Sequence, residues 1–305
     1  MESKIKALKQ LLYEASDLRM AQAVLDWDQS TFMPEGGAPA RARQTALLAR
    51  LAQEKATDPR IGHLLDELQA YAESLPFDHP EAALVRVARR DYERRLKVPP
   101  AFMGQMIQLG SEAFSVWAKA RPENDFKAVQ PYLEKILDNS RRLADFFPGY
   151  EHIADPLIDF FDLGMKATTL RQLFAELRRE LVPLVQSITA QPPVDDSCLR
   201  RKFSRDGQLA ICEQLVRQIG YDFNRGRLDL THHPFTTRFS HGDVRITTRV
   251  NEHDLGDCLF SCIHEAGHAM YEQGTNPDFD GTPLGVGTSS GVHESQSRLW
   301  ENQVG

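Results

Sequence analysis

The sequence predicts a mainly α-helical fold with one small antiparallel β-hairpin. Apolar residues recur every three or four positions through the first half, proline and glycine interrupt that pattern at intervals, and strand-forming residues gather only once, between positions 235 and 250. Because the breaks are spread along the chain, residues 1–305 are expected to form a single domain, with 1–75 as an N-terminal helical subregion and 231–305 as a core around the hairpin. With 41% hydrophobic residues, a chain of this length can bury a sizeable core.

The expected helices follow one another from the N-terminus. The first spans residues 4–27, with apolar side chains along one face, and ends before the proline- and glycine-containing break at 34–37. The second starts near residue 38 and continues through residue 51. The remaining segments are residues 61–75, 79–96, 100–121, 126–147, 170–188 and 208–219.

The expected hairpin pairs residues 235–239 with residues 244–250. Both segments are rich in Thr, Val, Ile and Phe, and Ser240 to Asp243 form the turn between them. An exposed strand edge can pair with an extended peptide, which would make the hairpin part of a substrate site. The alternative is that its threonines are there only because they form strands well.

The most informative stretch is residues 264–268, which read His-Glu-Ala-Gly-His. The surrounding residues 251–273 are expected to form a helix, because capping residues precede them and a glycine follows. On a helix this spacing places His264 and His268 on one face, where both imidazoles can bind one metal ion. The carboxylate of Glu265 then reaches water at the metal and can accept its proton. This pattern is typical of a hydrolytic site.

A hydrolytic metal site needs a third protein ligand, which is expected downstream. Residues 275–291 are rich in Gly, Pro, Ser and Thr and indicate a loop, and residues 292–301 then resume as a helix. Glu294 in its first turn would complete a His, His, Glu ligand set. Spacing alone leaves His293 and Glu301 as alternatives.

The four cysteines do not indicate a disulfide framework in a chain of this length. Cys258 and Cys262 lie on the same helix as the two histidines, but their spacing turns them away from that face. We expect them to be thiols that face the core, not metal ligands.

Charge and hydropathy exclude two kinds of partner. A net charge of -7 argues against nucleic acid. Residues 1–18 alternate charged and apolar side chains without a continuous apolar run, so they form neither a signal peptide nor a membrane span. We therefore expect a cytoplasmic protein with no membrane partner.

Several spaced motifs together resemble the carboxypeptidase Taq family of metallocarboxypeptidases. HEAGHAMYEQG at 264–274 and HESQSR at 293–298 match the family's H-E-x-x-H and H-E-S-[GQ] markers. HPFTT at 233–237, DVRIT at 243–247 and WDQ at 27–29 match further family segments. The resemblance implies Glu294 as the third ligand, a helical body with a deep substrate groove, and a homodimer.

Family members are longer than this sequence. Their C-terminal part carries two further motifs, I-R-x-x-A-D and G-x-x-Q-D-x-H-W, which do not occur in residues 1–305. We expect the chain to be an incomplete member that, taken alone, hydrolyses peptides poorly.

The resemblance also implies the chemistry. It predicts one divalent metal, zinc first with cobalt or manganese as alternatives, and peptide substrates with a free C-terminus. A cation must bind the substrate carboxylate, and Arg245 and Arg298 are the arginines within or beside the motifs. The resemblance makes the arginine of the absent I-R-x-x-A-D motif the more natural choice. His233, in the HPFTT segment, is a third candidate for substrate binding.

Two other functions stay open at this point. A related oligopeptidase or dipeptidyl carboxypeptidase would use the same metal helix, and an inactive fragment would bind metal without turnover. A di-iron carboxylate site needs Glu-x-x-His twice, and only Glu265 to His268 has that pattern, so the sequence excludes it.

Overall fold

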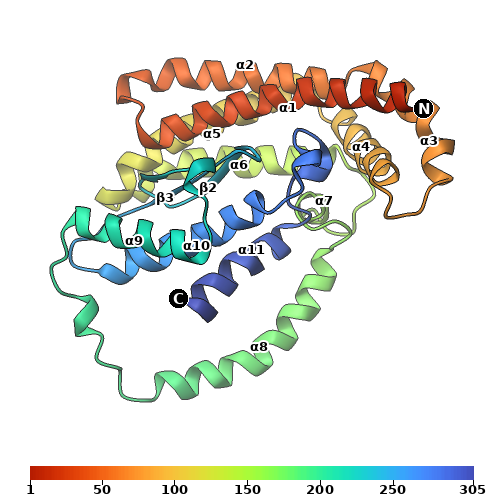
Figure 1. Ribbon diagram of the computed structural model, residues 1–305. Helices are drawn as coiled ribbons and strands as arrows, with labels where there is room; N and C mark the ends of the chain where they lie inside the picture. Colours follow the sequence, from red (N-terminus) through yellow and green to blue (C-terminus); the bar gives the residue numbers. More distant parts are fainter.

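The computed structural model describes residues 1–305 and is mainly helical with one small sheet (Figure 1). Its helices are α1 (Glu2–Thr31), α2 (Ala38–Ala56), α3 (Pro59–Glu73), α4 (Pro80–Leu96), α5 (Pro100–Glu123), α6 (Phe126–Asp145), α7 (Asp155–Asp159), α8 (Ala167–Thr189), α9 (Arg205–Ile219), α10 (Leu255–Gln273) and α11 (Ser290–Leu299). Its strands are β1 (Leu228–Leu230), β2 (Thr236–Ser240) and β3 (Asp243–Thr248). The mainly α fold class is confirmed.

The expected helices are all present, with ends that differ by a few residues. α3, for example, begins at Pro59 because the side chain of Asp58 accepts a hydrogen bond of 2.9 Å from the backbone N–H of Arg60. The short helix α7 was not expected. It has five residues, too few for a periodic pattern.

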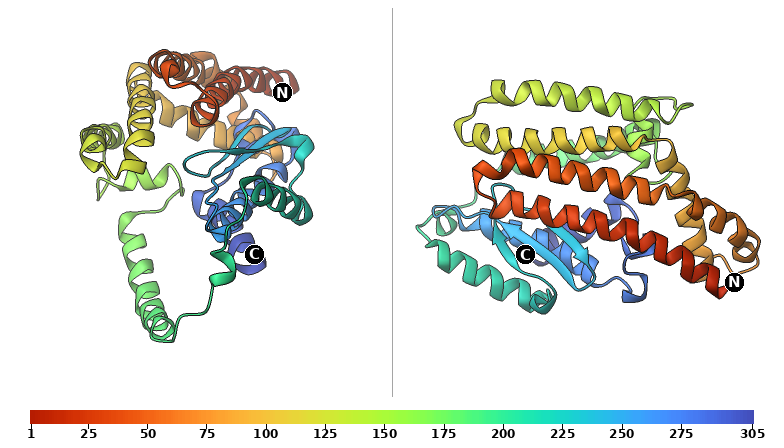
Figure 2. Two further views of the ribbon diagram at one scale, coloured as in Figure 1. Left: turned by 90° about the vertical axis from the view of Figure 1, so that its left-hand side faces the viewer. Right: turned by 90° about the horizontal axis from the view of Figure 1, so that it is seen from above.

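The N-terminal half forms a layer of long helices over the sheet. Seen from above, α1, α2, α5 and α6 lie side by side in that order (Figure 2). α3 and α4 pack at the end of α1, where Leu8, Ile61, Leu65 and Leu68 are fully buried. Each such side chain contributes about 1.5–3 kcal/mol by leaving water, so this cluster stabilises the packing of α1, α3 and α4.

The sheet has three strands in the order β1-β3-β2. β2 and β3 form the expected antiparallel hairpin, with Thr236 opposite Ile246. The expectation of a hairpin alone was incomplete, because β1 pairs with β3 in parallel, with Leu228 opposite Ile246. β1 has only three residues, so no alternating pattern in the sequence marked it.

A second core joins the sheet to α9 and α10. Cys258 and Cys262 are completely buried in it, together with Val216 and Ile246, so the expectation of core-facing thiols is confirmed. Cys212 and Cys258 are free thiols whose sulfur atoms lie 3.5 Å apart. These contacts fix one face of α10 against the sheet and leave the opposite face for the histidines.

α8 lies apart from the rest of the molecule. In Figure 1 it extends below the body, joined to α7 at one end and to the segment before α9 at the other. Its apolar side chains are exposed from Leu173 to Ile188. No helix of the protein combines the length and the apolar character that crossing a membrane requires.

Candidate metal centre

α10 carries the two histidines into close contact with α11. The side chain of Asp254 caps the start of α10 by accepting a hydrogen bond from the N–H of Asp257. Gly267, between the histidines, faces α11, and a Cβ atom there would lie only 2.7 Å from the Cα of Ser297. A side chain at position 267 would therefore separate the two helices, which explains the glycine within the motif.

This close approach brings three expected ligands together. Nε2 of His268 lies 3.2 Å from Oε2 of Glu294, and Nε2 of His264 lies 3.7 Å from the same oxygen. The three ligand atoms all lie within 4.8 Å of one another. Ligand atoms on a four-coordinate zinc ion, with bonds of about 2.0 to 2.2 Å, are roughly 3.3 to 3.6 Å apart, so both distances from Glu294 are close to those of such a site.

The two alternative ligands contact the opposite sides of the histidine rings. Oε2 of Glu301 lies 2.8 Å from Nδ1 of His264, and Nδ1 of His293 lies 2.6 Å from Nδ1 of His268. Metal-binding histidines commonly donate their second ring N–H to such an acceptor, which orients the ring. Glu301 and His293 thus support the histidines, and Glu294 faces the nitrogens that remain.

A further carboxylate fixes the proton positions in this network. Oε1 of Glu272 lies 2.9 Å from Nε2 of His293 and accepts a hydrogen bond from its N–H. In a neutral His293 the other ring nitrogen, Nδ1, is then an acceptor. Nδ1 of His268 then donates to His293, and the Nε2 atom of His268 keeps a free lone pair. Burial, followed by the neighbouring His293 and His264, lowers the pKa of His268 to about 4, which keeps this ring neutral at pH 7.

Glu265 lies beside the three ligands but does not join them. Its side chain is buried, and the hydroxyl of Thr236 on β2 lies 2.7 Å from Oε2 and 2.8 Å from the backbone oxygen of Glu265. Burial raises the pKa of Glu265 above its ordinary value, although the Thr236 hydrogen bond works in the other direction. A carboxylate with a raised pKa next to a metal site suits a general base.

Glu294 is held in its ionised form by Arg298. Nε of Arg298 donates to Oε1 of Glu294 at 3.0 Å, and Nη1 donates to Glu301 at 2.9 Å. Partial burial opposes ionisation of Glu294, but the hydrogen bond from Arg298 and the nearby His264 outweigh it, so the pKa of Glu294 lies below its ordinary value. An ionised Glu294 is the form that binds a cation.

The other expected substrate residues lie on the sheet side of the molecule. Arg245 pairs with Asp243 at 2.7 Å and packs over the rings of Trp27 and Phe239. His233 is exposed in the loop before β2, edge-on to the ring of Trp117. Neither belongs to the cluster of His264, His268 and Glu294.

The cluster opens into a hollow of about 300 Å³ that is lined by both helices and by β2. Thr236 and Glu272 belong to this lining but were not expected as site residues. Thr236 was expected only as part of the hairpin, either as a strand former or at an edge that pairs with substrate. Glu272 could have been found, since it lies four residues after His268 and therefore on the same helix face.

Comparisons with known proteins agree with one another. The sequence profile described as Carboxypeptidase Taq (M32) metallopeptidase matches residues 7–305. Carboxypeptidase 1 of Bacillus subtilis is 37% identical over 97% of this chain and 59% of its own length, and Thermostable carboxypeptidase 1 of Thermus thermophilus is 38% identical over 100% and 62%. A solved M32 carboxypeptidase from Deinococcus radiodurans is 49% identical, with a TM-score of 0.84 over 99% of this chain and 60% of that one. The chain thus spans about 60% of the length of these relatives.

Proposed function

Because the chain belongs to the carboxypeptidase Taq family of metallopeptidases, we propose that it releases amino acids from the free C-terminus of peptides at the His264, His268 and Glu294 cluster. The observation that carries the proposal is the convergence of these three residues next to Glu265. Its carboxylate is buried, forms no ion pair within the protein and is hydrogen-bonded only by Thr236. Two imidazoles and one carboxylate form the ligand set of a hydrolytic metal site.

The donor atoms fit one divalent cation. Both histidines keep a free Nε2 lone pair, because Glu301 and His293 occupy the other ring nitrogens. Nitrogen and carboxylate ligands suit zinc best, and the same set also accepts cobalt or manganese. A cation held there would polarise a peptide carbonyl and lower the pKa of water.

Glu265 would carry the proton during hydrolysis. Its Oε2 atom is engaged by Thr236, so Oε1 is free to accept a proton from water and to deliver it to the departing amine. The raised pKa of Glu265 brings this carboxylate closer to neutral pH, where proton transfer in both directions is efficient. The reaction needs no covalent intermediate with the protein.

A free peptide carboxylate requires a cation in the same region. Among the three candidates we propose Arg298, since its side chain is 54% exposed and its Nη2 atom makes no hydrogen bond within the protein. Arg245 would brace the hairpin against α1, and His233 would contact the substrate farther from the metal.

Peptide digestion tests the proposal. The protein is loaded with zinc, cobalt or manganese in turn and given one peptide as the free acid and as the amide. Slow, stepwise release of single residues from the free acid is expected. Release of dipeptides would favour the related oligopeptidase, and binding of metal without any hydrolysis would favour the inactive fragment.

Three further attributes are proposed from the sequence and the family. They are a homodimer, a cytoplasmic location and the absence of nucleic-acid or membrane partners, the last supported by the net charge of -7. Light scattering tests the first, because a dimer has twice the mass of the chain.

A further inference from the structure

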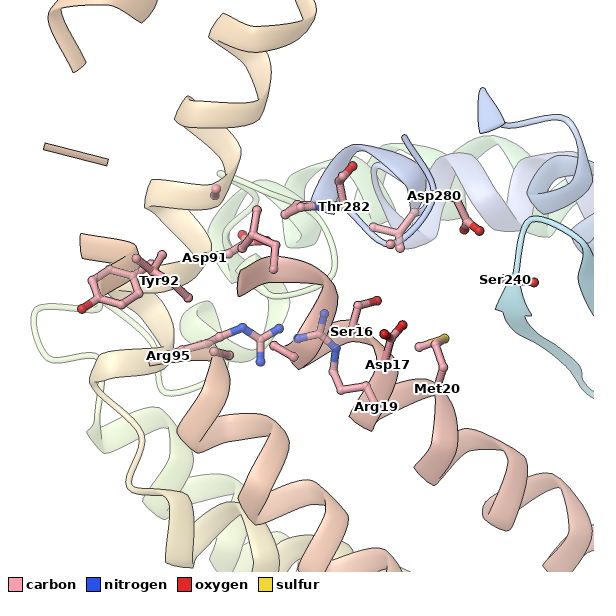
Figure 3. Close-up of a pocket in the computed structure, with 18 of the residues that line it drawn as sticks. Ser16, Asp17, Arg19, Met20, Asp91, Tyr92, Arg95, Ser240, Asp280 and Thr282 are labelled. Carbon is pink, nitrogen blue, oxygen red and sulfur yellow. The ribbon is translucent and has the colours of Figure 1, made fainter. Parts of the chain in front are cut away.

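A second cavity lies away from the metal centre, between α1, α4 and the segment that follows α10 (Figure 3). Its volume is about 260 Å³, near the lower end of the roughly 300 to 1,000 Å³ of small-molecule sites. Of the residues that line the hollow at the metal site, only Arg238 also lines this cavity. The two spaces are therefore separate sites with one shared wall.

Two arginines from different helices point toward one another in this cavity. Figure 3 shows the guanidinium groups of Arg19, on α1, and Arg95, on α4, facing each other across it. Both side chains are partly buried, and no ion pair or hydrogen bond within the protein engages either guanidinium. Partial burial removes part of the hydration of each charge, and a bound anion would compensate for that loss.

The surroundings disfavour the positive charge on both arginines. Burial, and then the charge of Arg95, lower the pKa of Arg19 to about 10. Burial likewise lowers the pKa of Arg95. A group with a pKa of about 10 is still protonated at pH 7, so two adjacent positive charges remain in the cavity.

Asp91 lies near enough to raise the pKa of both arginines, but no acid that lines the cavity forms an ion pair with either guanidinium. Asp91 is engaged by Arg90 at 2.9 Å, and Asp280 is engaged by Arg238. Asp17 is exposed. The hydroxyl of Ser16, which is buried in the wall, adds a further donor.

We propose that this cavity binds the phosphate group of a small phosphate monoester. A phosphate dianion balances two guanidinium charges, and its three terminal oxygens can accept from both forks at once, whereas a carboxylate has one charge and two oxygens. The rest of the wall includes Leu12, Ile61 and Phe239, which offers apolar surface to the organic part of the ligand.

Calorimetric titration of the full chain tests the proposal. The probes are inorganic phosphate, glycerol 3-phosphate, sulfate and succinate, at one pH and one ionic strength. Phosphate is expected to bind with a measurable dissociation constant and to raise the melting temperature. Tighter binding of glycerol 3-phosphate supports an ester ligand, and equal binding supports the same site with free phosphate as its ligand.

Variants locate the binding. Arg19→Gln and Arg95→Gln are each expected to weaken phosphate binding at least tenfold without lowering the melting temperature in phosphate-free buffer, because each removes one of two repelling charges. Arg95→Lys keeps the positive charge but loses the paired N–H donors of the guanidinium, so it should weaken phosphate binding less than Arg95→Gln does. Arg86→Gln, an exposed position on the same helix, controls for net charge and should change nothing. The proposal is overturned if both Gln variants bind phosphate and sulfate as tightly as the parent does. It is also overturned if the parent binds succinate more tightly than phosphate.

Discussion

The Nδ1 atoms of His268 and His293 lie 2.6 Å apart, and this contact joins the helix of the first two ligands to the helix of the third. Because Glu272 accepts a hydrogen bond from the Nε2–H of His293, the Nδ1 of His293 accepts from His268, and the free Nε2 lone pair of His268 is turned toward Glu294. In the proposed site, the orientation of His268 therefore depends on His293 and Glu272, which are not proposed as ligands.

Removing this support should weaken metal binding without abolishing it. His293→Ala and Glu272→Gln are each expected to lower zinc affinity about 10- to 100-fold, while one ion still binds at saturation. Competition with a chromogenic chelator measures the affinity. His253→Ala, an exposed histidine on the loop before α10, is the matched control and should leave the affinity unchanged. Unchanged affinity in both test variants would remove the orienting role.

The second prediction separates the third ligand from its neighbour. Glu294→Ala is expected to weaken zinc retention by more than Glu301→Ala, because Glu294 faces both Nε2 atoms whereas Glu301 contacts only the Nδ1 atom of His264. Loss of an orienting partner typically costs about 10- to 100-fold in affinity, and loss of a ligand is expected to cost more because it removes a bond to the metal. The opposite order in equilibrium dialysis would reassign the ligand to Glu301.

The third prediction separates binding from catalysis at Glu265. Glu265→Gln keeps the shape of the side chain and can still accept from Thr236, but an amide does not take up a proton at neutral pH. The variant is expected to bind one zinc ion with the parental affinity and to lose about a hundredfold or more in kcat. Metal analysis and single-turnover digestion of one peptide measure the two quantities. Parental turnover in this variant would contradict the general-base role.

Much of the site could be predicted from the sequence because its geometry is local. Two histidines four residues apart share a helix face in any α-helix, and the hydrophobic pattern was enough to predict that helix. The separation of roles among His293, Glu294 and Glu301 could not be predicted from spacing. It depends on how far α11 is rotated against α10, which the contact at Gly267 sets in three dimensions.

Two other features could not be predicted from the sequence, for different physical reasons. β1 is three residues long and is held by its parallel neighbour, not by its own pattern. The guanidinium groups of Arg19 and Arg95 face each other because of how α1 packs against α4. In the sequence, each of these arginines resembles an ordinary charged residue on a helix surface.

The fourth prediction concerns pH and the connection between α7 and α8. Asp155 is buried and accepts hydrogen bonds from the backbone N–H groups of Ala167 at 2.8 Å and His152 at 2.9 Å. The bond from Ala167 is the main cause that lowers the pKa of Asp155 below its ordinary value. A lowered pKa in the folded state stabilises the protein above the unfolded pKa of about 3.9, and this contribution is lost as the pH falls through the folded value.

Asp155→Asn should therefore be less stable than the parent at pH 7, and the difference should shrink as the pH falls below about 4. Urea unfolding at several pH values, compared between the two proteins, measures it. Asp138→Asn removes an exposed carboxylate on α6 and should show no such dependence. A difference that stayed constant down to pH 3 would mean that the charge of Asp155 contributes nothing.

The last prediction tests the close contact between α10 and α11. Gly267→Ala adds a methyl group 2.7 Å from the Cα of Ser297, where backbone cannot move aside as a flexible side chain would. At an exposed helix position, a Gly→Ala change stabilises the folded protein by about 0.5 to 1 kcal/mol. Gly110→Ala on α5 is expected to have this effect, because no atom lies within 4 Å of the new methyl group. At position 267 the overpacking should instead cost about 1 to 3 kcal/mol. Because α11 carries Glu294, the displacement should also weaken zinc binding while His264 and His268 stay on their helix. Unfolding and zinc titration of both alanine variants measure the two effects. If Gly267→Ala is as stable as Gly110→Ala and binds zinc as tightly, the position of α11 does not depend on this contact.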